Sequence, residues 1–199
     1  MIDYLSVEKY ADDLLRSLPE TLLYHNASHA HEVCDNAASL GKTENISEED
    51  MLLLKTAALF HDIGFLVKYH DNEKDAVEMI RPKLPVFGYT DGQIEQISRM
   101  ILATAIPQNP RSLPEKILCD ADLDNLGRDD FFKNTQAIWK ELCSFGVATG
   151  EKEWYLNTLS LIQSHCYFTE TARQLRNRGK EKNIAQLKAW IKERFGGSA

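Results

Sequence analysis

The sequence predicts an all-α protein with essentially no β-sheet. Apolar residues recur at three-to-four-residue spacing, capping motifs and prolines delimit the segments, and no segment alternates apolar and polar residues between turn signals. The chain has 199 residues, of which 43% are apolar and 27% charged, values typical of a folded protein. Since it has no repeat and no long linker, we expect a single domain over residues 1–199.

The first two predicted helices are amphipathic. Residues 4–17 carry leucines and a tyrosine at helical spacing, and this helix should end near Pro19. The alanine-rich stretch 27–40 has an apolar face, and we expect Gly41 to close that helix.

The next three helices are predicted from capping motifs and breakers. Residues 47–50 (Ser-Glu-Glu-Asp) read as a capping box that opens the helix MLLLKTAALF. That helix is apolar almost all round, so it should be buried at the centre of the domain. A further helix runs from about residue 72 to 84 and stops before Pro85. Residues 90–93 (Thr-Asp-Gly-Gln) cap another, which ends before Pro107.

The C-terminal half also reads as helical. After a proline-rich loop, Pro114 should start a helix at the favoured first position. Another helix should begin at residue 129 or 130 and run to about residue 146. Thr149 should begin the next, and the last should cover about residues 182–194.

The charge and the termini exclude several classes of protein. The net charge is −7 and the pI is near 5.4, which argues against a protein that binds a nucleic-acid polymer. No apolar run approaches the ~20 residues of a membrane span, and the acidic N-terminus is no signal peptide. The four cysteines form no CxxC pair, so we expect reduced, buried thiols in a cytoplasmic protein.

Histidines and aspartates gather at a few places in apolar sequence. His25 and His29 are four residues apart at the start of a predicted helix, where they should share a face. His61 and Asp62 end the most apolar helix, and two more aspartates lie in the segment ILCDADLDNLG. A lone buried histidine is usually an ordinary core residue, but buried imidazoles and carboxylates together are costly unless paired. A shared divalent cation removes that cost.

The first of these motifs resembles that of a known group of enzymes. The order His…His-Asp…Asp is similar to the HD superfamily of metal-dependent phosphohydrolases. Tyr24–Ala30, with the sequence YHNASHA, resembles the opening motif of the cyclic-nucleotide phosphodiesterases. The resemblance implies that His29 binds metal and that His25 donates a proton to the leaving group.

The remaining motifs complete the resemblance. His61 and Asp62 match the signature pair, and Asp122 in Ala-Asp-Leu matches the last ligand, so we prefer Asp122 to Asp120. Asp120 is expected to be a surface acid or to orient a ligand histidine. The resemblance implies a core near residues 24–127, with the helices of 128–199 packed on it.

The implied activity is hydrolysis of a small phosphoester, a nucleotide or cyclic nucleotide among the candidates, by metal-activated water. The enzyme would be a phosphomonoesterase or a phosphodiesterase. His29, His61, Asp62 and Asp122 would hold at least one divalent ion, with Mn, Mg, Zn, Fe and Co all open. Asp62 would also serve catalysis, and His25 suits proton donation because histidine titrates near pH 6.5.

Two departures from relatives bear on a second ion and on the rival functions. Asn72 and Thr104 stand where many two-metal members have histidines. A histidine-rich second site is therefore disfavoured, although a second ion held by Asp62 and water stays open. The rivals are a non-catalytic HD-type nucleotide sensor and a di-iron HD oxygenase, and the latter needs the absent histidines.

Other polar residues are candidates for substrate binding or for the surface. His31 lies two residues from His29 and should point away from the ligand face. His165 lies near a helix end and precedes a basic run. From that run we select Arg173 and Lys182 as binders of substrate phosphate, the alternative being a solvated helix face.

Overall fold

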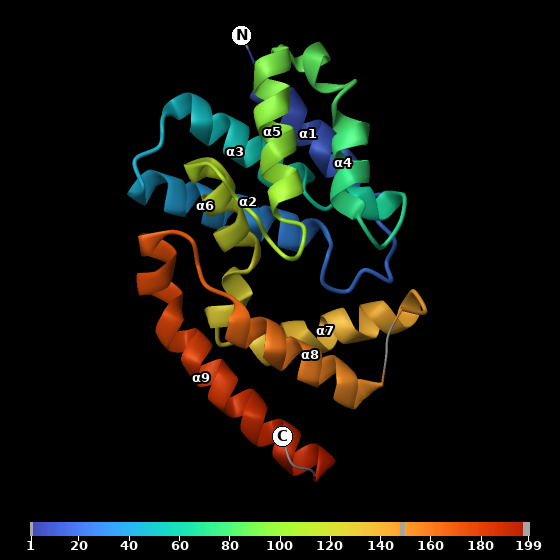
Figure 1. The fold of residues 1–199 in the computed structure, drawn as a ribbon. Coiled ribbons are helices and arrows are strands. Elements are labelled where there is room, and N and C mark those ends of the chain that lie inside the picture. Colours follow the sequence, from blue (N-terminus) through green and yellow to red (C-terminus); the bar gives the residue numbers. More distant parts are fainter. Residues whose placement is uncertain (1, 148–149, 197–199) are drawn as a thin grey trace. The chain divides into compact units, whose positions relative to one another are not determined.

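The regular elements of the residues that the computed structural model describes, 2–147 and 150–196, are all helices, and these residues contain no β-strand (Figure 1). The all-α prediction is thus confirmed. The chain divides into two compact units, Met1–Asp122 and Leu123–Ala199, and each is described by itself. The prediction of a single domain over residues 1–199 stays a prediction.

The first unit is built around one buried helix. Its elements are α1 (Tyr4–Leu15), α2 (Ala27–Thr43), α3 (Glu48–Phe60), η1 (Ile63–Leu66), α4 (Asn72–Ile80), η2 (Leu84–Phe87), α5 (Asp91–Ala103) and α6 (Leu113–Asp122). As expected from its apolar sequence, α3 is buried along most of its length and packs against α1, α2, α5 and α6 (Figure 1). The residues that follow its C-terminal end, His61 and Asp62, therefore lie in the interior of this unit.

Side-chain caps start the helices of this unit where the sequence indicated. The Ser47 hydroxyl accepts from the backbone N–H of Asp50 at 3.0 Å at the start of α3. Thr90 and Gln93 form the predicted capping box at the start of α5, each side chain binding the other's backbone N–H. These bonds satisfy donors that a helix start otherwise leaves unpaired.

Two predicted helix ends in this unit are wrong. Gly41 lies inside α2, where a Cβ would come within 2.9 Å of Ile46 Cδ1 and Met51 Cε. Its role is close packing rather than termination. The helix from Asn72 ends at Ile80, four residues earlier than predicted, and Pro85 lies in η2. A proline ring clashes with the carbonyl four residues back, so an α-helix cannot continue toward Pro85.

The second unit packs its helices around a separate apolar cluster. Its elements are η3 (Asp124–Gly127), α7 (Phe131–Ser144), α8 (Glu151–Ser164) and α9 (Glu170–Phe195). Its cluster is formed by the buried residues Leu126, Phe131, Tyr155, Leu159, Ile162, Leu187 and Ile191. Gly127 and Gly179 bring η3 against α9, since a Cβ on Gly179 would lie 1.9 Å from the Gly127 carbonyl oxygen.

The last helix begins twelve residues before its predicted start at residue 182. Thr169 caps α9 by accepting from the backbone N–H of Ala172 at 3.2 Å. Much of the added stretch is charged and lacks a regular apolar face, so periodicity did not reveal it. Pro114 is the second rather than the first residue of α6, and the predicted start at Thr149 lies outside the described residues.

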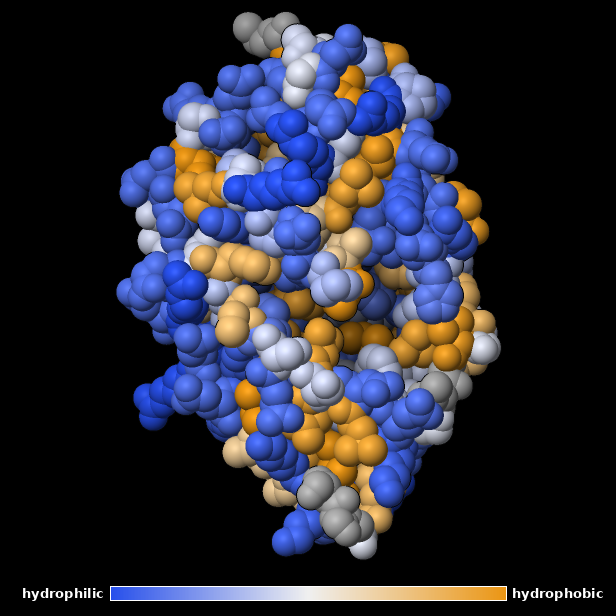
Figure 2. Space-filling model, viewed as in Figure 1, coloured by the Kyte–Doolittle hydropathy of each residue, from blue (hydrophilic) through white to orange (hydrophobic). Residues whose placement is uncertain are grey.

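The cysteines and the surface complete the description. Cys34 and Cys119 are buried as expected, but Cys143 and Cys166 are exposed, so the prediction of four buried thiols is wrong for half of them. Hydrophilic residues cover most of the face in Figure 2, consistent with the 27% of charged residues. No helix in the described part of the chain combines the length and apolar character needed to cross a membrane.

Candidate metal centre

The first histidine pair is placed by the start of α2. Asn26 caps this helix, its side-chain oxygen accepting from the backbone N–H groups of Ser28 at 2.9 Å and His29 at 3.4 Å. His29 therefore lies in the first turn and is buried. His25 precedes the cap, so the two histidines are not on one helix face as expected. The turn nonetheless places their rings 5.7 Å apart.

The second pair follows the end of α3. His61 is 1% exposed, and its Nδ1 lies 2.7 Å from the carbonyl oxygen of Ala58. Because a carbonyl only accepts, Nδ1 must carry the hydrogen, which leaves the lone pair of neutral imidazole on Nε2. Asp62 is the next residue and is also buried. This arrangement aims Nε2 of His61 as a metal ligand requires.

Asp122, the last residue of α6, closes the group. Its Oδ1 lies 3.3 Å from Nε2 of His29 and 3.5 Å from Nε2 of His61. Asp62 Oδ2 lies 3.5 Å and 3.1 Å from the same two nitrogens. Ligands bound to one ion at about 2.0–2.2 Å are separated by about 3.0–3.5 Å, so each aspartate oxygen has ligand spacing from both histidine nitrogens. Among the described residues, His29, His61 and Asp122 form a group whose ligand atoms all lie within 4.8 Å of one another, and Asp62 adjoins this group through the two histidines.

The hydrogen bonding of these atoms also fits a cation. Nε2 of His29, Nε2 of His61 and Oδ2 of Asp62 are buried, and none of them makes a hydrogen bond within the described part of the chain. Each such orphaned polar atom costs about 1–3 kcal/mol. One divalent ion would satisfy all three together with the carboxylate of Asp122. The donor set therefore fits a divalent metal with imidazole and carboxylate ligands.

The charges of Asp62 and Asp122 favour a positive charge beside them. Burial disfavours protonation of His61, but Asp62 and Asp122 outweigh it and raise its pKa well above the ordinary value. Burial opposes ionisation of the two aspartates, yet the neighbouring histidines lower the pKa of both. Without a metal the carboxylates thus favour a proton on His61, and a divalent ion would compete for the same place.

Asn72 and Glu73 lie near Asp62, and the sequence did not indicate either of them as part of the site. Asn72, expected only as a missing ligand, is buried, and its amide nitrogen donates to Asp62 Oδ1 at 3.3 Å. Glu73 is half-buried, and burial and then the charges of Asp62 and Asp122 raise its pKa. In the sequence, the only indication for Glu73 was that it follows Asn72, the position where a histidine was expected. The packing of α4 against η1 is what brings both residues near Asp62. Thr104 instead donates its hydroxyl to the Ile101 carbonyl at 2.8 Å.

The surface prediction for His31 holds. Its side chain is exposed and lies 3.0 Å from Asp12 in α1. Asp120 is fully buried, which excludes the alternative of a surface acid, and its role in orienting a ligand histidine stays a prediction.

The predicted phosphate binders belong to the second unit. His165 ends α8 and stacks edge-on against Tyr167, with ring centroids 4.6 Å apart. Arg173 donates to the Tyr167 carbonyl at 3.0 Å and to Glu170 at 3.1 Å. The substrate-binding role of His165, Arg173 and Lys182 stays a prediction.

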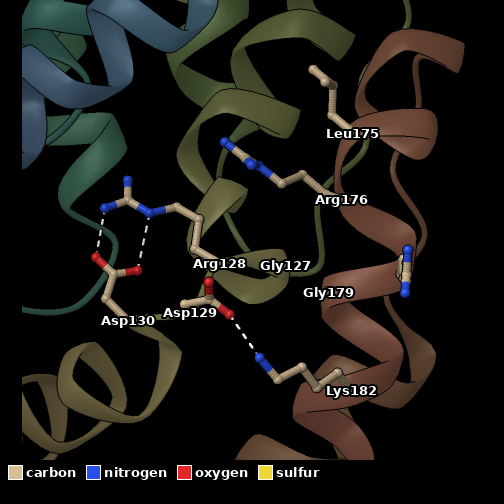
Figure 3. Close-up of a pocket in the computed structure, with 9 residues that line it drawn as sticks. Gly127, Arg128, Asp129, Asp130, Leu175, Arg176, Gly179 and Lys182 are labelled. Carbon is tan, nitrogen blue, oxygen red and sulfur yellow. Dashed lines mark hydrogen bonds and ion pairs between the residues drawn. The ribbon is translucent and has the colours of Figure 1, made fainter.

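A pocket of about 750 Å³ in this unit is lined by residues of η3, the loop after it and α9 (Figure 3). Lys182 donates to Asp129 at 2.9 Å, and Arg128 pairs with Asp130 through two bonds. These cations are already paired with carboxylates, so an anion would have to displace those partners.

Comparisons with known proteins agree with the fold. The family model described as HD domain matches residues 26–125. Bacillus subtilis YpgQ, solved in complex with ADP, is 23% identical with a TM-score of 0.64, over 94% of this chain and 96% of that one. A predicted HD superfamily hydrolase from an uncultured Thermotogales bacterium is 18% identical with a TM-score of 0.59, over 96% and 90%. A Lactobacillus plantarum protein is 18% identical with a TM-score of 0.66, over 95% and 98%. No curated protein is detectably similar in sequence.

Proposed function

Since this chain belongs to the HD domain family, we propose that it is a divalent-metal-dependent phosphohydrolase acting on a small phosphoester, with a nucleotide as the favoured substrate. One observation carries the proposal: the buried Nε2 atoms of His29 and His61, which make no hydrogen bond in the described part of the chain, converge with a carboxylate oxygen of Asp122 within 4.8 Å. Two proteins of similar structure support it, one a predicted HD superfamily hydrolase and the other solved in complex with ADP.

The metal would be held by His29, His61, Asp62 and Asp122. When bound, a divalent ion makes water nucleophilic near neutral pH and withdraws charge from a phosphoryl oxygen. The protein's contribution is to fix the geometry. The Ala58 carbonyl holds the His61 ring, and the start of α2 holds His29. Burial of the ligands lowers the local dielectric and strengthens each electrostatic contact with the phosphoryl group.

His25 is proposed as the proton donor to the leaving oxygen. Its ring is half-buried and lies 5.7 Å from the ring of His29 and 4.8 Å from that of Phe65. It thus lies beside His29 but outside the group of His29, His61 and Asp122 that could hold a metal. A histidine at this place can hold a proton near neutral pH and release it as the bond to the leaving group breaks.

The test is phosphate release from nucleotides, cyclic nucleotides and sugar phosphates, supplied with Mn²⁺, Mg²⁺, Co²⁺ or Zn²⁺. We expect metal-dependent release that is abolished in Asp62→Ala. His25→Ala should lose turnover but keep its metal, His29→Ala should lose both, and His31→Ala, a surface histidine of the same helix, should lose neither. No release from any substrate, with the metal bound, would overturn hydrolysis in favour of a nucleotide sensor. Bound iron with near-ultraviolet absorbance would indicate an oxygenase.

A further inference from the structure

The two oxygens of Asp62 have different surroundings. Oδ2 faces Nε2 of His61 at 3.1 Å and Nε2 of His29 at 3.5 Å, while Oδ1 accepts from the amide nitrogen of Asn72 at 3.3 Å. We infer that Asn72 is a positioning residue that reserves one oxygen of Asp62 for itself, so that this centre takes a single divalent ion. The inference rests on the proposed metal-dependent function and decides a question which the sequence left open.

Asn72 is held in place by close backbone packing. It is only 6% exposed and opens α4 directly after Asp71, whose backbone is left-handed with φ at 54°. Gly64 in η1 packs against it so closely that a Cβ would lie 1.8 Å from the Asn72 carbonyl oxygen. Only glycine permits this approach. The amide therefore lies on a backbone segment that packs directly against Gly64, the second residue after Asp62.

The orientation of the amide follows from its partner. An ionised carboxylate only accepts hydrogen bonds, so the end of the Asn72 side chain that faces Asp62 must be the NH₂ group. An amide NH₂ presents positive hydrogens and offers no lone pair to a cation. It therefore strengthens the monodentate binding of Asp62 through Oδ2, and it opposes any cation beside Oδ1.

A second ion would need Oδ1 of Asp62 as a ligand. In two-metal hydrolytic centres the ions lie about 3.5–4 Å apart, close enough to share ligands. A shared aspartate would have to turn Oδ1 toward the second ion and give up the Asn72 amide. The hydroxyl of Thr104, the other position at which a histidine was expected, is engaged by the Ile101 carbonyl. Neither position thus supplies a nitrogen ligand.

The test is a titration of the metal-free full-length chain with Mn²⁺, monitored by calorimetry and by electron paramagnetic resonance. We expect one ion per chain and the six-line signal of isolated Mn²⁺. Asn72→Leu, which loses the amide, should still bind one ion, about 10- to 100-fold more weakly, the usual effect of removing a partner of a metal ligand. Asn72→Asp, which is nearly isosteric but turns the donor into a carboxylate, should bind a second ion and show spin coupling.

Thr104→Val is the matched control, because it removes a buried hydroxyl that is bonded to the Ile101 carbonyl, in the last turn of α5. It should bind one ion with unchanged affinity. Two ions on the wild-type chain, or an Asn72→Leu chain with unchanged affinity, would overturn the inference, and so would an Asn72→Asp chain that binds only one ion. If a variant fails to fold by circular dichroism, the wild-type stoichiometry still decides. One bound ion without phosphate release refutes only the proposed function, and two ions with metal-dependent release refute only the inference.

Discussion

The contact between Gly64 and the start of α4 predicts a large effect from a single methyl group. In Gly64→Ala the new Cβ would lie 1.8 Å from the Asn72 carbonyl oxygen, 2.6 Å from its carbon and 2.9 Å from the Ala76 nitrogen. All three are backbone atoms, so no side chain can rotate away, and η1 must move relative to α4. Overpacking usually costs 1–3 kcal/mol. We expect about 3 kcal/mol, and a melting temperature lower by about 6–12 °C for a chain of this size.

The assay is urea unfolding followed by circular dichroism at 222 nm, with Gly92→Ala as the control. Gly92 lies in the first turn of α5 with no atom within 4 Å of an added Cβ. That substitution should stabilise the protein by about 0.4–1 kcal/mol, because alanine loses less backbone entropy than glycine. A Gly64→Ala protein as stable as the wild type, or a Gly92→Ala protein destabilised to the same degree, would refute the reasoning. Gly64→Ala should also bind Mn²⁺ more weakly, since the amide of Asn72 moves with its backbone.

Three further predictions concern metal binding, the charge of His61 and the hydrogen bonds of Glu115. Mn²⁺ at 100 times its dissociation constant should stabilise the chain by about 2.7 kcal/mol, seen as a rise of about 5–10 °C in melting temperature that is absent in His29→Ala. In the metal-free protein the raised pKa of His61 gives stability that is complete below its unfolded pKa of about 6.5 and is lost as pH rises through the folded pKa. The difference in urea midpoint between wild type and His61→Ala should therefore narrow as pH rises, and a difference that widens would contradict this sign. Glu115 accepts from the backbone N–H groups of Arg111 and Ser112, and although burial opposes ionisation these bonds lower its pKa, so Glu115→Ala should cost about 1 kcal/mol at pH 7. That cost should shrink as pH falls from about 4.3 through the lowered folded pKa, and a pH-independent loss would contradict it.

Local signals in the sequence were enough for most of the fold. Ser47 and Thr90 start their helices through bonds to residues within three positions, so the cap can be recognised from neighbours alone. That these histidines and aspartates lie together was also predictable, because buried imidazoles and carboxylates in apolar sequence need a partner. The family resemblance then selected Asp122 over Asp120.

What the sequence did not reveal depends on contacts between distant segments. Gly41 looked like a helix end, but its lack of a side chain serves the approach of Met51 from α3. Asn72 looked like a lost ligand, because its bond to Asp62 exists only once Gly64 has brought α4 against η1. The early start of α9 at Glu170 escaped detection because its first turns show little apolar periodicity.

The most direct test of the metal centre is anomalous diffraction from crystals grown with Mn²⁺. We predict one peak per chain, about 2.0–2.3 Å from Nε2 of His29, Nε2 of His61 and one oxygen each of Asp62 and Asp122. A fully loaded crystal whose manganese lies elsewhere, with these four side chains bonded only to one another, would contradict it.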